Sequence, residues 1–139
     1  MIAVDQRQAL PDYGPWTTKQ GEVTVLPPRH VLESIITIRL HLDACDATNG
    51  ALKVVPGSHK HGVIANEYHP IYTPRAITCP VPAGGVLLMQ PLTLHASNRS
   101  TSTRPRRVIH LEFSATELPA RLTWRERPHL PLPQTSRLF

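Results

Sequence analysis

The chain has 139 residues, enough for one domain with a hydrophobic core, and its composition of 40% hydrophobic and 18% charged residues excludes an intrinsically disordered protein. Its two cysteines exclude a disulfide framework, and no apolar run approaches the roughly 18 residues that a membrane span needs. The net charge is +5, and no signal-peptide pattern follows Met1, so we expect a soluble cytoplasmic protein without a membrane partner.

Fifteen prolines favour many short elements over long helices. Residues 1–28 have the composition of a loop, with one strand predicted at residues 22–26. In "VLESIITIRLHLD", residues 31–43, apolar and polar side chains then alternate, which predicts a strand. We expect its apolar side to face the core and its polar side to point away. The apolar side consists of Ile36, Ile38, Leu40 and Leu42, and the polar side of Thr37, Arg39, His41 and Asp43.

The second half of the chain continues as strands and turns. The segment "ACDATNG" predicts a turn, "ALKVV" a strand that ends at Pro56-Gly57, and "ITCPVPAGGVLLMQP" two strands around a further turn. The last strand is predicted in "RRVIHLEF". Five or six strands without an amphipathic helix predict an all-β sandwich or barrel over residues 1–118. A Pro- and Arg-rich tail, residues 119–139, is expected to be extended or poorly ordered.

One stretch, "LLMQPLTLHASNRSTSTRPRRVIHLEF", combines side chains that suit a metal and a carboxylate. His95 ends an apolar run, Ser97 lies two residues further on, and Arg106 lies eleven residues further on. A hairpin with these intervals can bring an imidazole, a hydroxyl and a guanidinium to one end of a barrel. Arginine binds carboxylates through a planar fork, so the set suits a metal together with a small dicarboxylate. A purely structural histidine remains the alternative.

Other features suggest weaker alternatives. His59, His61 and Glu67 resemble a cupin metal motif, although the glutamate follows late. Cys45 and Cys79 lack partners at zinc spacing and are interpreted as core or loop residues. Nucleic-acid binding is the second function class considered. It is suggested by the basic C-terminal segment, in which Trp124 stands among Arg121, Arg125 and Arg127. A solvated basic surface is the simpler interpretation of these residues.

Three segments in this order, "RLHLDACDATNGALKVVPGSHKHG", "PAGGVLLMQPLTLHAS" and "RRVIHLEF", resemble the phytanoyl-CoA dioxygenase family over residues 35–113. Proteins of that family are Fe(II)- and 2-oxoglutarate-dependent oxygenases built on a double-stranded β-helix, a jelly-roll or cupin-like barrel. The resemblance implies that His95 is the distal iron ligand and that Ser97 and Arg106 hold the distal carboxylate of 2-oxoglutarate. Arg107 is the second candidate for that arginine, and Ile36 is implied to line the cofactor pocket.

The family takes its other two iron ligands from a His-x-Asp motif. His41 and Asp43 form such a motif, but in family members a stretch of this kind precedes the Asn-Gly turn and the iron motif lies further upstream. The resemblance therefore implies a C-terminal portion of an oxygenase for a small-molecule or acyl substrate, with an incomplete barrel and impaired activity. A non-catalytic binding module is the alternative. The exposed strand edges of an incomplete barrel predict self-association.

Overall fold

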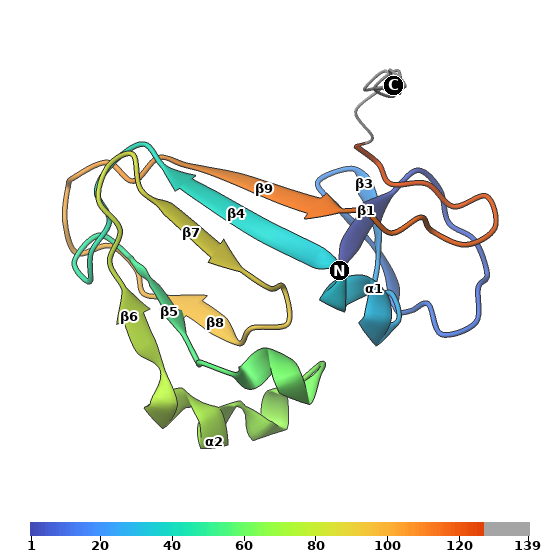
Figure 1. Ribbon diagram of the computed structural model, residues 1–139, viewed down its shortest axis with the longest axis horizontal. Coiled ribbons are helices and arrows are strands. Elements are labelled where there is room, and N and C mark those ends of the chain that lie inside the picture. Colours follow the sequence, from blue (N-terminus) through green and yellow to red (C-terminus); the bar gives the residue numbers. More distant parts are fainter. Residues whose placement is uncertain (127–139) are drawn as a thin grey trace, which may run out of the picture. The chain divides into compact units, whose positions relative to one another are not determined.

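A computed structural model describes residues 1–126, which fall into two compact units (Figure 1). Among the described residues, the first unit combines residues 1–27 with residues 117–126, and the second spans residues 28–116. Residues 127–139 lie outside the described residues, so most of the predicted tail is not tested.

The first unit contains a three-stranded antiparallel sheet in the order β1 (Ile2–Val4), β3 (Glu22–Val25) and β2 (Trp16–Lys19). The strand predicted at residues 22–26 is confirmed as β3, whereas β1 and β2 were not predicted. The start of the predicted tail packs within this unit, because Leu122 is buried and Trp124 forms a β-bridge. The buried side chains of the unit include Ile2, Val4, Val25, Leu118 and Leu122.

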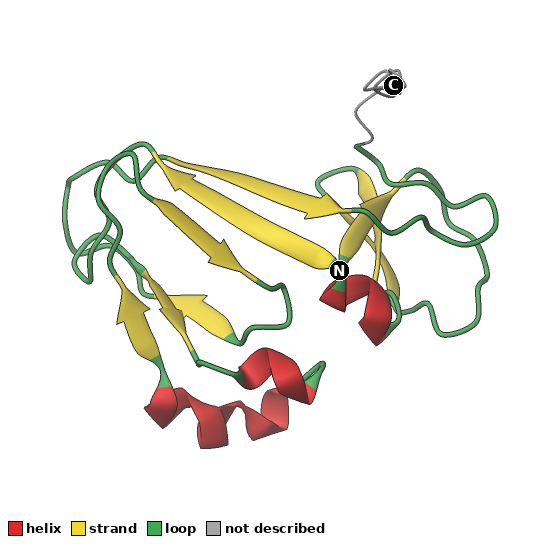
Figure 2. Cartoon of the chain, viewed as in Figure 1, coloured by secondary structure: helices red, strands yellow, loops and turns green. Residues whose placement is uncertain are grey.

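The second unit contains most of the regular structure, and its helices are all short. In chain order its elements are α1 (Arg29–Glu33), β4 (Ile35–His41), β5 (Leu52–Val54), η1 (Ser58–His61), η2 (Asn66–Tyr68), α2 (His69–Tyr72), η3 (Thr73–Arg75), β6 (Ile77–Cys79), β7 (Val86–Met89), β8 (His95–Ser97) and β9 (Val108–Ser114). Strands predominate, as Figure 2 shows, and the predicted all-β class is confirmed.

Two antiparallel three-stranded sheets form this unit, one in the order β7-β4-β9 and the other in the order β6-β5-β8. They converge at one end, where Cys45 pairs with Val81 and the His41 amide donates to the Gly85 carbonyl (Figure 1). Within the described residues β8 and β9 each pair on one side only, and the sheets do not close into a barrel. The arrangement is that of an incomplete cupin-like fold, as predicted.

The central strand β4 exposes the opposite face from the one that we predicted. Thr37 and His41 are only 1% and 2% exposed, whereas Ile36 and Leu42 are 54% and 48% exposed. The prediction that the apolar side faces the core was therefore wrong, and so was the placement of Ile36 in a pocket. Alternation shows that the two faces of a strand differ, but it does not show which face the rest of the fold covers.

The outer face of the β7-β4-β9 sheet is a continuous apolar surface. Cross-strand partners share a face, so β4 residues align there with apolar residues of both neighbours. One row is Leu88, Ile38 and Leu111, in which Leu88 is 64% exposed and Leu111 is 43% exposed. The other exposed members of the surface are Ile36, Val86, Ile109 and Phe113. A contiguous apolar surface of this kind commonly marks an interaction site.

We predict that this surface makes the isolated chain self-associate. Replacing Leu88 and Leu111 together by Glu places two charges in one row and should shift the chain toward monomer in sedimentation velocity. Ile71→Glu is the matched control, because Ile71 is 68% exposed but lies on α2. A wild-type chain that sediments as a monomer at all concentrations would contradict the prediction.

Candidate functional site

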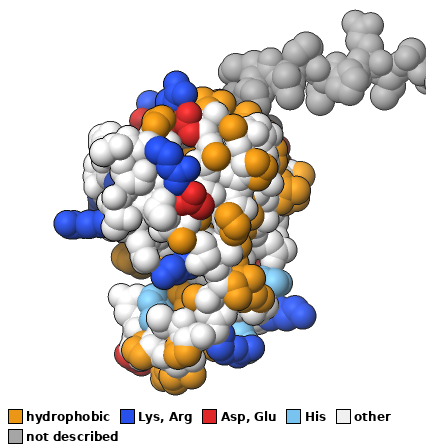
Figure 3. Space-filling model, turned by 90° about the vertical axis from the view of Figure 1, so that its left-hand side faces the viewer, with side chains coloured by type: hydrophobic (Ala, Val, Ile, Leu, Met, Phe, Trp, Pro, Cys, Tyr) orange, Lys and Arg blue, Asp and Glu red, His pale blue; other side chains and the backbone are white. Residues whose placement is uncertain are grey.

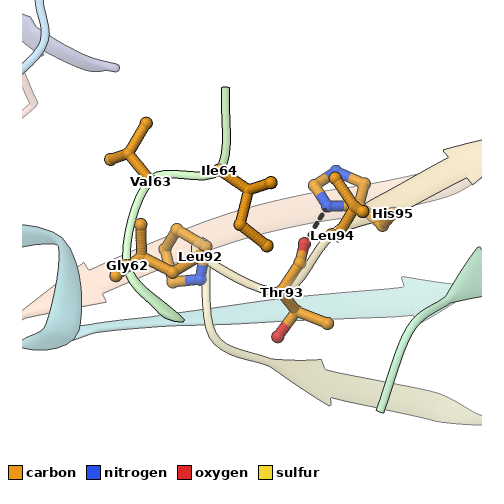
Figure 4. A pocket seen from close by; sticks show the side chains of 8 residues that line it. Gly62, Val63, Ile64, Leu92, Thr93, Leu94 and His95 are labelled. Atoms are coloured by element: carbon orange, nitrogen blue, oxygen red, sulfur yellow. Dashed lines mark hydrogen bonds between the residues drawn. The ribbon is translucent and has the colours of Figure 1, made fainter. Parts of the chain in front are cut away.

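His95 lies at the start of β8, opposite Val54 of β5, and lines a pocket of about 210 Å³ (Figure 4). The other lining residues are Gly62, Val63, Ile64 and residues 91–94. The ring Nδ1 lies 2.7 Å from the carbonyl oxygen of Thr93. Because a carbonyl oxygen only accepts, Nδ1 carries the hydrogen and the lone pair is on Nε2. Metal-ligating histidines commonly donate their other ring N–H to a backbone carbonyl, and His95 makes such a contact.

The position of His95 depends on the buried hydroxyl of Ser58, in the turn that follows Pro56-Gly57. Ser58 is 1% exposed; its Oγ donates to the Val55 carbonyl at 2.7 Å and accepts from the Leu94 amide at 2.8 Å. The Val55 amide donates to the Leu94 carbonyl at 2.9 Å. The "PGSH" turn is therefore fastened to the residue that directly precedes His95.

Arg106 lies beside the end of β8. Its Nη1 donates to the Gly50 carbonyl, and a Cβ on Gly50 would lie 3.0 Å from Nη1 and 3.0 Å from the Asn98 carbonyl oxygen. Asn98 directly follows Ser97, so the guanidinium lies near the end of the strand that carries both His95 and Ser97. Gly50 is required there twice, for this close approach and for its φ of +86°.

The turn before Gly50 is held by Asn49, which is fully buried. Its Oδ1 accepts from the Asp46 amide at 2.7 Å, and its Nδ2 donates to the Ala44 carbonyl at 2.8 Å. Both ends of the side-chain amide are therefore satisfied by the backbone of the turn. The predicted Asn-Gly turn thus forms the support against which Arg106 rests.

Arg107, the second candidate for the carboxylate, is already paired. Its Nε and Nη2 donate to the two oxygens of Asp43 at 2.9 Å and 2.8 Å, and its backbone amide donates to the same carboxylate at 2.8 Å. These hydrogen bonds lower the pKa of Asp43 to about 2. The Arg107 side chain is 70% exposed. This geometry favours Arg106 over Arg107, although the assignment of Arg106, Ser97 and His95 stays a prediction.

His41 lies in a buried position, contrary to our expectation that it points away from the interior. Neither of its ring nitrogens has a hydrogen-bond partner in the described residues. Burial lowers the pKa of His41, and the charges of Arg39 and Arg106 lower it further. Arg39, which we did not single out from the sequence, is its neighbour on the same face of β4. Its Nη1 lies 3.0 Å from His110 Nδ1.

The residues described here do not by themselves complete an iron site. No group of three or more His, Cys, Asp or Glu side chains within residues 1–126 is placed to hold a metal ion. The facial triad needs two histidines and a carboxylate. His95 has the geometry of one ligand, but the Asp43 carboxylate is bound to Arg107. No step of a reaction can therefore be derived through iron from these residues alone.

The cupin-like motif of His59, His61 and Glu67 is not placed as a metal-binding group within residues 1–126; Glu67 lies in η2. His59 and His61 lie in η1, and the His61 ring packs at a centroid distance of 5.7 Å from Tyr72. Cys45 is buried, and both it and Cys79 are free thiols.

The basic C-terminal segment gives little support for nucleic-acid binding. Arg125 is bound to Glu22 at 2.5 Å, and Trp124 lies in a β-bridge with Val4, while Arg127 is outside the described residues. On the face that Figure 3 shows, Lys and Arg side chains lie scattered among uncharged ones. No helix within residues 1–126 is long and apolar enough to cross a bilayer.

Comparison with known proteins supports the family and the fold. The family model "Phytanoyl-CoA dioxygenase (PhyH)" matches residues 11–108. A solved structure titled "Crystal Structure of EvdMO1" is 26% identical, with a TM-score of 0.54; the match covers 78% of this chain and 24% of that chain. No curated protein matches. The incomplete cupin-like fold is consistent with this family match. The chain belongs to the phytanoyl-CoA dioxygenase family.

Ser58→Ala tests the support of His95. The part-buried Leu94 amide would lose its acceptor, so we expect a loss of about 1–3 kcal/mol in the free energy of unfolding, measured by urea denaturation. Ser100→Ala removes an exposed hydroxyl and should change stability by less than about 0.5 kcal/mol. Equal stability of the two variants would show that the Ser58 hydroxyl does not hold the pocket together.

Gly50→Ala and Gly84→Ala separate backbone strain from crowding. Both glycines have positive φ, +86° and +77°, but nothing lies within 4 Å of a Cβ on Gly84. Each substitution should cost roughly 1–2 kcal/mol for the left-handed backbone. Gly50→Ala should cost about 1–3 kcal/mol more, because the Asn98 carbonyl must move. Thermal unfolding measures the difference, and identical losses would argue against the close packing of Arg106 on the turn.

Proposed function

We propose that this chain carries the co-substrate side of a 2-oxoglutarate-dependent oxygenase site. His95 supplies one iron ligand through Nε2, and Arg106 with Ser97 holds the distal carboxylate of 2-oxoglutarate. The supporting observation is the fixed tautomer of His95 at a pocket, with a guanidinium beside the end of the same strand.

The strand geometry suits a five-carbon dicarboxylate. His95 and Ser97 are two residues apart on β8, so their side chains lie on one face, about 6–7 Å apart along the strand. This separation is comparable with the length of 2-oxoglutarate. One end of the molecule would reach the metal at His95, and the other would reach Ser97 and Arg106. The fork of Arg106 accepts a carboxylate through two parallel hydrogen bonds.

Bound Fe(II) and 2-oxoglutarate would supply the oxidation of a C–H bond of a small-molecule or acyl substrate, with succinate and CO₂ formed from the co-substrate. The two missing ligands would come from a His-x-Asp motif in a longer form of the protein. This chain alone would then have impaired activity. The alternative, a non-catalytic binding module, is favoured only by the lack of three clustered ligands in residues 1–126.

A succinate assay tests the proposal. Fe(II), 2-oxoglutarate and O₂ are added to this chain and to a version extended upstream by a segment with a His-x-Asp motif. We expect succinate above the metal-only background from the extended form alone. His95→Ala should abolish it, and His30→Ala, at an exposed histidine of α1, should not.

Two arginine variants of the extended form identify the carboxylate ligand. Arg106→Gln should raise the KM for 2-oxoglutarate about tenfold or more, and Arg107→Gln should leave it unchanged. If the unextended chain is active and His41→Ala removes that activity, His41 and Asp43 are the iron motif instead. An extended form that binds 2-oxoglutarate but produces no succinate would favour the binding module.

A further inference from the structure

A cluster of cationic and imidazole side chains lies on the inner face of β4, outside the roles assigned so far. Arg39 and His41 are two residues apart, so they share a face, and His41 pairs with Val108 of β9. Arg106 precedes Val108, the first residue of β9, by two residues, so it continues the same face before the start of that strand. His110, opposite Arg39, lies on that face as well.

The charges of this cluster have no counter-ion among the described residues. Neither Arg39 nor Arg106 forms a salt bridge within residues 1–126. The acid nearest in register, Glu112, is engaged further along the strand, 3.4 Å from the Thr37 hydroxyl and 3.5 Å from His110 Nε2. The two arginines also lie close enough for the charge of Arg106 to lower the pKa of Arg39, after burial.

Part of the cluster's hydrogen-bonding capacity is unused, although Arg39 Nη1 lies 3.0 Å from His110 Nδ1 and Arg106 Nη1 donates to the Gly50 carbonyl. His41 is 2% exposed, and neither Nδ1 nor Nε2 has a partner; the buried Nε of Arg39 has none either. A buried polar group without a hydrogen bond is costly, and the like charges of Arg39 and Arg106 repel each other. An anion between them would satisfy the free N–H groups and remove the repulsion. A carboxylate fits both the planar forks of arginine and the single N–H of a neutral imidazole.

We propose that Arg39, His41 and Arg106 together form a carboxylate-binding site, which takes the distal carboxylate of a dicarboxylic 2-oxo acid. The inference rests on the proposed function for the identity of that acid. Arg39 and His41 are then specificity-determining residues: they select a second carboxylate at the end of the co-substrate remote from the metal. A monocarboxylic acid would leave the cluster without its counter-ion and bind weakly.

The test is calorimetric titration of the metal-free chain with four probes: 2-oxoglutarate, glutarate, pyruvate and butyrate. Without metal the 2-oxo group has nothing to chelate, so we expect 2-oxoglutarate and glutarate to bind and the two monocarboxylates to bind at least about tenfold more weakly. Arg39→Gln and His41→Gln should each weaken glutarate about tenfold or more. Arg39→Lys should recover only part of the loss, because an ammonium lacks the fork.

Arg75→Gln is the matched control, since it removes one positive charge from an exposed residue of η3 and should leave glutarate affinity unchanged. Circular dichroism melts establish that each variant is folded, and Arg39→Lys keeps the test valid if His41→Gln unfolds.

Unchanged affinity in both Arg39 variants, with binding lost in Arg106→Gln, would overturn the inference and leave the role of Arg106 intact. Failure of the wild-type chain to bind either diacid at millimolar concentration would also overturn it. The succinate assay of the extended form would then decide the oxygenase proposal independently.

Discussion

The hydroxyl of Ser58 is the contact on which the arrangement of the site depends. It is buried, it donates to Val55 and it accepts from Leu94, so it joins the turn after β5 to the residue before His95. Because a buried hydroxyl in this position has no water to replace either partner, the geometry of the turn and that of the strand are fixed together. The Thr93 carbonyl, one residue before Leu94, accepts from Nδ1 of His95 and so determines which ring nitrogen carries the hydrogen. The "PGSH" segment is thus a structural support for the histidine.

A second constraint is the reversed polarity of the β7-β4-β9 sheet. Its inner face carries Arg39 and His41, and its outer face carries a row of exposed apolar side chains. A sheet that stabilised itself alone would bury the apolar face. The polar inner face has a physical reason if it holds an anion, because the burial of uncompensated guanidiniums would otherwise be unfavourable. The apolar outer face requires another protein surface to cover it. The polar inner face and the uncovered outer face both fit a chain that spans 24% of the EvdMO1 chain it matches.

Much of the fold could be predicted from local pattern, and the site could be predicted only through resemblance. The alternation in β4 and the Asn49-Gly50 turn have strong local signals, and both were confirmed. The burial of β4 was predicted wrongly because period two carries no information on which face is covered. The strands β1 and β2 are three and four residues long, too short to give a periodic signal. Arg39 was missed because its significance comes from Arg106 and His41 together, which only the register of β4 with β9 reveals.

The most direct test is a crystal structure of the extended form with Mn(II) and 2-oxoglutarate bound. We predict that the metal lies on Nε2 of His95 and on the upstream His-x-Asp motif. The distal carboxylate of 2-oxoglutarate should contact Arg106, with Arg39 and His41 within hydrogen-bond distance of the same carboxylate. A metal bound by His41 and Asp43, or a 2-oxoglutarate molecule placed away from Arg106, would contradict the assignment of the site.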